Sequence, residues 1–139
     1  MKRDITVWIE SENTPPSGET DKTSEKTSGT LYIKNDLYLI SYKESSEGLE
    51  DTTTTLKLKK DRLALMRSGK IVSHIIFEKG RPFNGIYPTP YGDFPITVTV
   101  NEIDIYSGDD SGYINLKYIL SLAGEEINNK LIVKYKTVT

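Results

Sequence analysis

The side chain in this sequence that is best suited to bind an anion is Arg67. It shares strand parity with Leu63 and Leu65, so the alternation of a β-strand predicts that it points into the protein. A buried guanidinium needs a carboxylate partner, because burying an unpaired charge is costly. Glu44 and Glu78, each at the end of a predicted strand, are the nearest candidates.

This arrangement has two interpretations. In the first, Arg67 holds an anionic ligand with Glu44 and Glu78 beside it, because the planar guanidinium fork matches a carboxylate or a phosphate. In the second, Arg67 and a glutamate form a structural ion pair that ties one end of the fold, or the parity is reversed and Arg67 is exposed. The sequence leaves both interpretations open.

A proline- and tyrosine-rich segment, residues 84–93, is the second candidate for function. Its prolines cannot donate to a strand ladder, and Tyr87 and Tyr91 each offer a ring and a hydroxyl. We therefore expect a stiff, aromatic connection at a rim or mouth, with Tyr87, Tyr91 and Tyr42 as candidate ligand contacts. Tyrosine is also an ordinary strand and core residue, which is the alternative for each of them.

The sequence predicts no catalytic site, metal site or cofactor. His74 is the one histidine, and no Ser-His-Asp or His-x-His spacing accompanies it, so we expect a surface or packed residue. Asp104, Asp109 and Asp110 lack the spacing of a calcium-binding EF-hand loop and are expected in a solvated turn.

Composition excludes several other classes of protein. The 139 residues include 0 cysteines, which excludes zinc-thiolate sites, thiol catalysis and disulfides. Lys and Arg number 18 against 20 Asp and Glu, so nothing steers the protein toward nucleic acid or a membrane surface. Neither the apolar run of about 7–15 residues of a signal peptide nor the ~20 of a membrane helix is found. We expect a soluble, cytoplasmic protein whose partner is a small-molecule ligand.

Short alternating segments separated by turn residues predict about eight or nine β-strands. They lie at residues 4–10, 30–33, 37–42, 52–59, 63–67, 71–78, 94–106, 113–122 and 131–136. Residues 11–28 are polar and contain consecutive prolines, so we expect a long polar loop there. The pattern at residues 119–123 also fits one helical turn.

The segment 94–106 changes parity along its length. Its apolar residues are Ile96, Val98, Val100, Ile103 and Ile105. A straight strand would send the even-numbered and odd-numbered sets to opposite faces of the sheet. A β-bulge near Asn101 and Glu102 would return both sets to one side, so we predict a bulge there.

These elements predict an all-β fold. Short sequential connections favour neighbouring antiparallel strands, hence a single domain, residues 1–139, that forms an up-and-down β-barrel of about eight strands. Closure of the barrel would remove exposed strand edges. A barrel of this size either fills with side chains or holds one small ligand.

From Tyr42 onward the sequence resembles the YwiB-like family of small bacterial proteins. The matching blocks are Tyr42-Lys43-Glu44, Thr53-Thr54-Thr55-Leu56-Lys57, Leu65-Met66-Arg67-Ser68-Gly69, Phe77-Glu78-Lys79-Gly80, Tyr87-Pro88-Thr89-Pro90-Tyr91-Gly92 and the region Tyr118-Ile119-Leu120. The resemblance implies a calycin-type barrel with lipocalin-like topology, and it implies no biochemical activity. Trp8 lacks the glycine of the lipocalin Gly-x-Trp signature, which argues against secreted transport of lipophiles.

We therefore expect a non-enzymatic binding module that takes a small organic or anionic ligand in the barrel or at its mouth. The candidate contacts are Arg67, Glu44, Glu78, Tyr42, Tyr87 and Tyr91. The alternative is a protein–protein interaction domain with a filled barrel and no ligand, which would use exposed strand faces or the segment 87–93. An enzyme that uses His74 or a Glu/Arg pair is the last of the three interpretations.

Overall fold

The computed structural model describes residues 1–45, 49–89 and 91–138. In this part of the chain, ten β-strands form one antiparallel sheet. The strands are β1 (Lys2–Thr14), β2 (Asp21–Lys34), β3 (Leu37–Lys43), β4 (Thr52–Leu58), β5 (Arg62–Gly69), β6 (Ser73–Glu78), β7 (Phe83–Thr89), β8 (Gly92–Ser107), β9 (Ser111–Leu122) and β10 (Glu125–Thr137). The segment 119–123, which also fitted a helical turn, continues β9 as far as Leu122.

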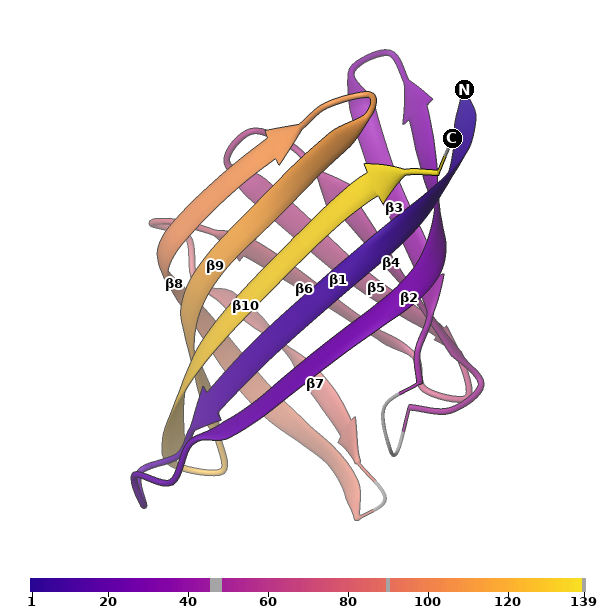
Figure 1. Ribbon diagram of the computed structural model, residues 1–139. Helices are drawn as coiled ribbons and strands as arrows, with labels where there is room; N and C mark the ends of the chain where they lie inside the picture. Colours follow the sequence, from indigo (N-terminus) through magenta and orange to yellow (C-terminus); the bar gives the residue numbers. More distant parts are fainter. Residues whose placement is uncertain (46–48, 90, 139) are drawn as a thin grey trace.

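The sheet is an up-and-down meander that curls into a barrel. Its strand order is β6-β5-β4-β3-β2-β1-β10-β9-β8-β7, so the first and last strands of the sequence are neighbours. Figure 1 shows β8, β9, β10, β1 and β2 as the near wall, with β3 to β6 behind it. Both termini lie at one end, which we call the termini end, and the turns that follow odd-numbered strands lie at the far end. The predicted all-β antiparallel barrel is confirmed, with ten strands instead of about eight.

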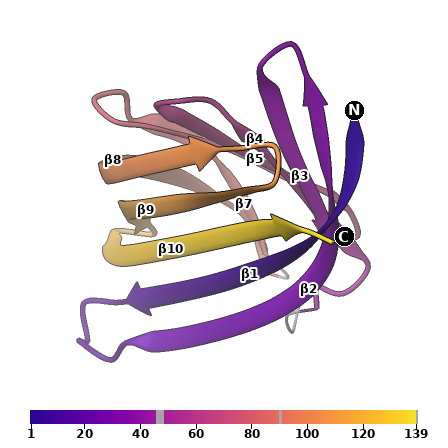
Figure 2. The same cartoon turned by 45° about the horizontal axis from the view of Figure 1, so that its top comes forward.

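The two edge strands, β6 and β7, meet at a seam (Figures 1 and 2). They are joined by side-chain packing, and no ladder pairs them among the described residues. The rings of His74 and Phe83 meet edge-on across the seam with their centroids 6.3 Å apart. An isolated bridge joins Lys79 to Val100 of β8. The barrel is thus nearly closed, which differs from the complete closure that was expected to remove its edges.

The strand absent from the sequence prediction is β7, which was interpreted as a stiff connection. It pairs with β8 so that Ile86 lies opposite Pro95 and Pro88 opposite Asp93. Proline is tolerated on an edge strand such as β7, because one side of that strand has no ladder partner. Pro95 lies just outside the pairing of β8 with β9, which begins at Ile96.

The expected polar loop at residues 11–28 is wrong over most of its length. β1 continues to Thr14 and β2 begins at Asp21, so only residues 15–20 form the turn. Threonine is a good strand residue, and hydroxyl pairs such as Thr14 with Thr20, 2.8 Å apart, cross the ribbon. This part of the hairpin extends past the apolar core, so neither face needs apolar side chains.

The inner face of β2 to β6 is arranged in rows of residues that lie opposite one another on successive strands. The central row is aliphatic and buried: Leu31, Ile40, Leu56, Leu65 and Ile75. The row nearer the termini end is also apolar or aromatic: Ile33, Tyr38, Leu58, Leu63 and Phe77. Buried side chains of β1, β8, β9 and β10 pack against these rows and fill the centre of the barrel.

The predicted bulge in β8 is confirmed. Pairing with β9 shifts between Val100 and Glu102, which leaves Asn101 as the extra residue. As a result, the valines before the shift and Ile103 and Ile105 after it all pack against the core.

Deleting Asn101 should therefore turn Ile103 and Ile105 to the outer face, because side chains alternate along a strand. We expect the free energy of unfolding to fall by about 3–5 kcal/mol as two isoleucine side chains leave the core. Urea denaturation measures this change. The control, Asn101→Ala, keeps the residue count and should cost less than about 1 kcal/mol. An equal loss in both variants would contradict the role of the bulge.

Candidate functional site

Arg67 lies on the inner face of β5, as its parity predicts, in the row that follows the central aliphatic row toward the far end. Across successive strand pairs, Tyr42 lies opposite Thr54 and Thr54 lies opposite Arg67. Arg67 in turn lies opposite Ser73 on β6. Residues directly opposite each other have Cβ atoms about 4.5–5.5 Å apart, so this row is a continuous polar strip at the edge of the core.

The carboxylate of Glu44, just after β3, turns back onto this row. Thr54 is fully buried, and its hydroxyl donates to Glu44 Oε1 at 2.8 Å. Burial raises the pKa of Tyr42 above its ordinary value, and the charge of Glu44 adds to the rise. Glu44 therefore already has a hydroxyl donor and a tyrosine beside it.

Arg67 has no such partner. Its Nε is buried and lacks a hydrogen-bond acceptor among the described residues, and the same is true of Ser73 Oγ across the β5–β6 ladder. In residues 1–45, 49–89 and 91–138, no carboxylate lies within ion-pair distance of Arg67. A guanidinium N–H and a serine hydroxyl are thus left side by side, and both can donate to an anion.

Tyr118 approaches Arg67 from the opposite wall, and Tyr87 of β7 lies near Tyr118. Tyr118 on β9 packs its ring edge-on against Phe77, with the centroids 4.8 Å apart. Burial raises the pKa of Tyr118 to about 12, while the nearby charge of Arg67 acts to lower it and Tyr87 acts to raise it. These side chains form one group, which we call the Arg67 cluster: Arg67, Tyr42, Glu44, Thr54, Ser73 and Tyr118. Tyr87 lies beside this cluster.

Two of the predicted site residues lie elsewhere. Glu78 is opposite Arg62, whereas Arg67 is opposite Ser73, and a rise of about 3.4 Å per residue puts roughly 17 Å between Ser73 and Glu78. Glu78 instead lies 4.0 Å from Arg81, so its expected pairing with Arg67 is wrong. Tyr91 is 93% exposed at the β7–β8 turn.

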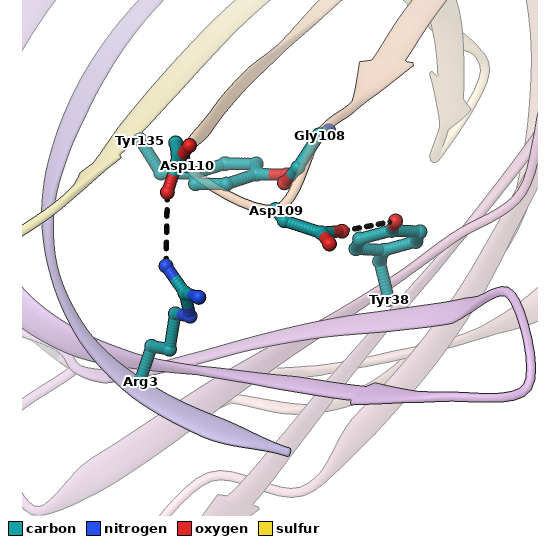
Figure 3. Close-up of polar contacts among 6 residues, drawn as sticks. All are labelled: Arg3, Tyr38, Gly108, Asp109, Asp110 and Tyr135. Atoms are coloured by element: carbon teal, nitrogen blue, oxygen red, sulfur yellow. Dashed lines mark hydrogen bonds and ion pairs between the residues drawn. The ribbon is translucent and has the colours of Figure 1, made fainter.

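At the termini end of the barrel, the turn between β8 and β9 reaches across to Tyr38 of β3, as Figure 3 shows. Tyr38 donates to Asp109 at 2.6 Å, and Arg3 pairs with Asp110 at 2.9 Å. The Tyr135 hydroxyl donates to the Gly108 carbonyl at 2.7 Å and accepts from the Gly108 N–H at 3.1 Å. Asp109 and Asp110 lie exposed in this turn, as expected, and they also hold it against β1 and β3.

The arrangement leaves the far end as the place where polar side chains meet the core. His74 follows Ser73 directly, but by strand alternation its side chain lies on the outer face of β6, where its ring contacts Phe83. The described residues contain no group of three or more His, Asp or Glu side chains that could hold a metal ion.

Sequence reasoning did not select Thr54, Ser73 or Tyr118 for the site. The positions of Thr54 and Ser73 opposite Arg67 could have been predicted from the lengths of the turns between the strands. The tight β4–β5 turn sets Leu58 opposite Leu63, and counting back from that pair places Thr54 opposite Arg67. Tyr118 belongs to the opposite wall, and its approach to Arg67 depends on how far the sheet curls.

A sequence model of a family described as a domain of unknown function, DUF1934, matches residues 7–132. The crystal structure of ywiB protein from Bacillus subtilis has a TM-score of 0.87 with this structure over 99% of this chain and 94% of that chain. The two sequences are 21% identical, so the likeness shows a shared fold. No curated protein matches the chain. These findings confirm the YwiB-like resemblance, and neither names a calycin.

No helix in the described part of the chain is long and apolar enough to cross a membrane.

The raised pKa of Tyr118 predicts a loss of stability at high pH. In the unfolded chain a tyrosine ionises near 10.0, whereas folded Tyr118 ionises near 12. Between these values the unfolded state loses a proton that the folded state keeps, so the free energy of unfolding falls by up to about 1.4 kcal/mol per pH unit. Urea denaturation between about pH 9 and pH 11 measures this fall.

The variant Tyr118→Phe should make the fall shallower, because its ring has no proton to lose. Tyr106→Phe, a change at a ring that is 54% exposed, is the control and should keep the wild-type pH dependence. Identical pH dependence in wild type and Tyr118→Phe would contradict the burial of this hydroxyl in the folded state.

Proposed function

Because the chain belongs to the family described as a domain of unknown function, DUF1934, which names no activity, we propose a function from the Arg67 cluster: the barrel binds a small anion at its far end. The ligand carries a carboxylate or a phosphate group, since these match the planar fork of a guanidinium. It is bound and not transformed.

The observation that carries this proposal is the buried Nε of Arg67 without a hydrogen-bond acceptor among the described residues. A buried N–H group that is left without an acceptor is destabilising, so proteins seldom keep one without a purpose. An anion bound at this position would supply both the missing acceptor and the opposite charge.

The neighbouring side chains fit the same role. Ser73 Oγ is the second buried group without a partner in the described part of the chain, and it lies directly across from Arg67. One anionic oxygen can accept from the guanidinium and another from this hydroxyl. Tyr118, which keeps its proton through neutral pH, offers a further donor from the opposite wall.

Glu44 supports the selectivity of the site. Its carboxylate is held by Thr54 on one side of the row, so it leaves the guanidinium available but places a negative charge near it. A ligand with one or two negative charges at a defined position can pair with the Arg67 guanidinium and stay out of contact with the Glu44 carboxylate. We therefore propose a small organic anion with a single carboxylate or phosphate group, in preference to a bulky polyanion.

The ligand lies at the mouth and not deep inside the barrel. Buried aliphatic side chains fill the centre, and the Phe77–Tyr118 ring pair spans it. His74 lies on the outer face, away from the hydroxyl groups of the cluster, which is why binding is proposed in preference to catalysis.

Arg67→Met tests the proposal in two ways. Without added anion, we expect the melting temperature to stay equal or to rise, because the variant replaces a half-buried guanidinium, whose Nε has no acceptor among the described residues, with an apolar side chain of similar volume. With wild type, an anion at about ten times its dissociation constant should raise the melting temperature by roughly 3–6 °C. Arg67→Met should show no such rise.

Phosphate, benzoate and acetate are the probes, each compared with chloride at the same ionic strength and followed by thermal unfolding. Arg62→Met is the matched control, since it removes the same charge from the same strand on the outer face and should keep the anion-dependent rise. If no probe stabilises wild type beyond chloride, or if Arg67→Met is stabilised equally, the proposed function is wrong.

A further inference from the structure

The outer face of the near wall carries a row of aromatic and basic side chains. Across five adjacent strands, residues that lie opposite one another are Lys26, Trp8, Lys134, Tyr113 and Tyr106. We call this row the Trp8 strip. A groove of about 640 Å³ runs along it, lined by all of these except Lys26. The groove belongs to the outside of the barrel and is separate from the Arg67 cluster.

The aromatic members of the strip are unusually open to solvent. Trp8 is 37% exposed and Tyr106 is 54% exposed. The rings of Tyr106 and Tyr113 lie 5.9 Å apart, and the ammonium of Lys26 sits 5.8 Å from the centre of the Trp8 ring. Exposed tryptophan and tyrosine side chains grouped in a groove are typical of the residues that contribute most to protein interfaces.

The lysines of the strip differ from those elsewhere on the same face. Two rows away, Lys22 lies 3.3 Å from Glu12, and Lys117 lies 3.5 Å from Glu102. By contrast, Lys26 and Lys134 have no carboxylate within ion-pair distance among the described residues, and neither does Lys136 in the next row. The strip is thus aromatic and positively charged; its lysines form no ion pair among the described residues, although Glu10 lines the same groove.

We propose that the Trp8 strip docks an extended, acidic segment of a partner polypeptide. Strands are about 4.8 Å apart, so the row is roughly 19 Å long, which an extended segment of about six residues spans. Carboxylates of the segment pair with Lys26 and Lys134, and its apolar side chains lie against Trp8 and Tyr106. The proposal adds an interaction surface to the ligand site and does not depend on it.

Charge also decides against two other occupants. A second copy of this chain, docked through the same strip, would bring like charges together. A nucleic acid carries a charge at every nucleotide and would bring phosphates alongside Glu10, which lines the groove, and Asp104 in the same flanking row. A peptide in which acidic and apolar side chains alternate can turn its apolar side chains toward these carboxylates and its own carboxylates toward Lys26 and Lys134.

The test uses the full chain and three fluorescein-labelled probes. They are a decapeptide of alternating glutamate and phenylalanine, its counterpart with lysine in place of glutamate, and decathymidylate. Fluorescence anisotropy measures binding, and the emission of Trp8, the single tryptophan, reports occupation of the strip directly. We expect the glutamate peptide to bind at least about tenfold more tightly than either other probe, and to bind less tightly as salt is added.

Lys26→Gln with Lys134→Gln should weaken binding of the glutamate peptide by about tenfold, and so should Trp8→Ala. The matched double control, Lys117→Gln with Lys130→Gln, removes the same charge from paired lysines and should change binding by less than about twofold. Tighter binding of decathymidylate, no binding of the glutamate peptide, or an equal loss in the control would each overturn the proposal.

Discussion

The constraint on which the rest of the structure depends is the lateral register of β2 to β6. Because side chains alternate in and out along each strand, one register setting decides every inward-facing row at once. Here it produces two apolar rows and then, next to them, the row that contains Thr54 and Arg67. A shift by one residue in a single hairpin would break the aliphatic row and separate Arg67 from its neighbours.

The two ends of the barrel differ in the side-chain contacts found there. At the termini end, the β8–β9 turn is fixed over the opening by Tyr38, Arg3 and Tyr135, which come from three different strands. The packing is tight as well, since a Cβ on Gly112 would come within 2.5 Å of the Tyr135 ring. At the far end, polar side chains follow the core directly. The two ends therefore differ: at one, side-chain hydrogen bonds fix a turn, and at the other, buried polar groups without partners among the described residues lie beside the core.

Much of the fold follows from patterns within single strands. Parity placed Arg67 on the inside, and the change of parity in β8 revealed the bulge at Asn101. The pairing of Arg67 with Glu78 could not be judged in this way, because it depends on the register between two strands. β7 was not predicted as a strand, because its prolines are acceptable only on an edge strand and the sequence does not show which strands lie at the edges of the sheet. The polar ends of β1 and β2 lacked the apolar alternation that marks most strands.

The pairing of β1 with β10 has a consequence for the order in which the chain is connected. Ile5 lies opposite Thr137, so residues near the two ends of the described chain are adjacent. Joining these ends and opening the chain at the β6–β7 turn would give a circular permutant whose sequence order equals its sheet order. Every strand would then be connected directly to its neighbour, and the contact that now spans nearly the whole chain would become local, which favours faster folding.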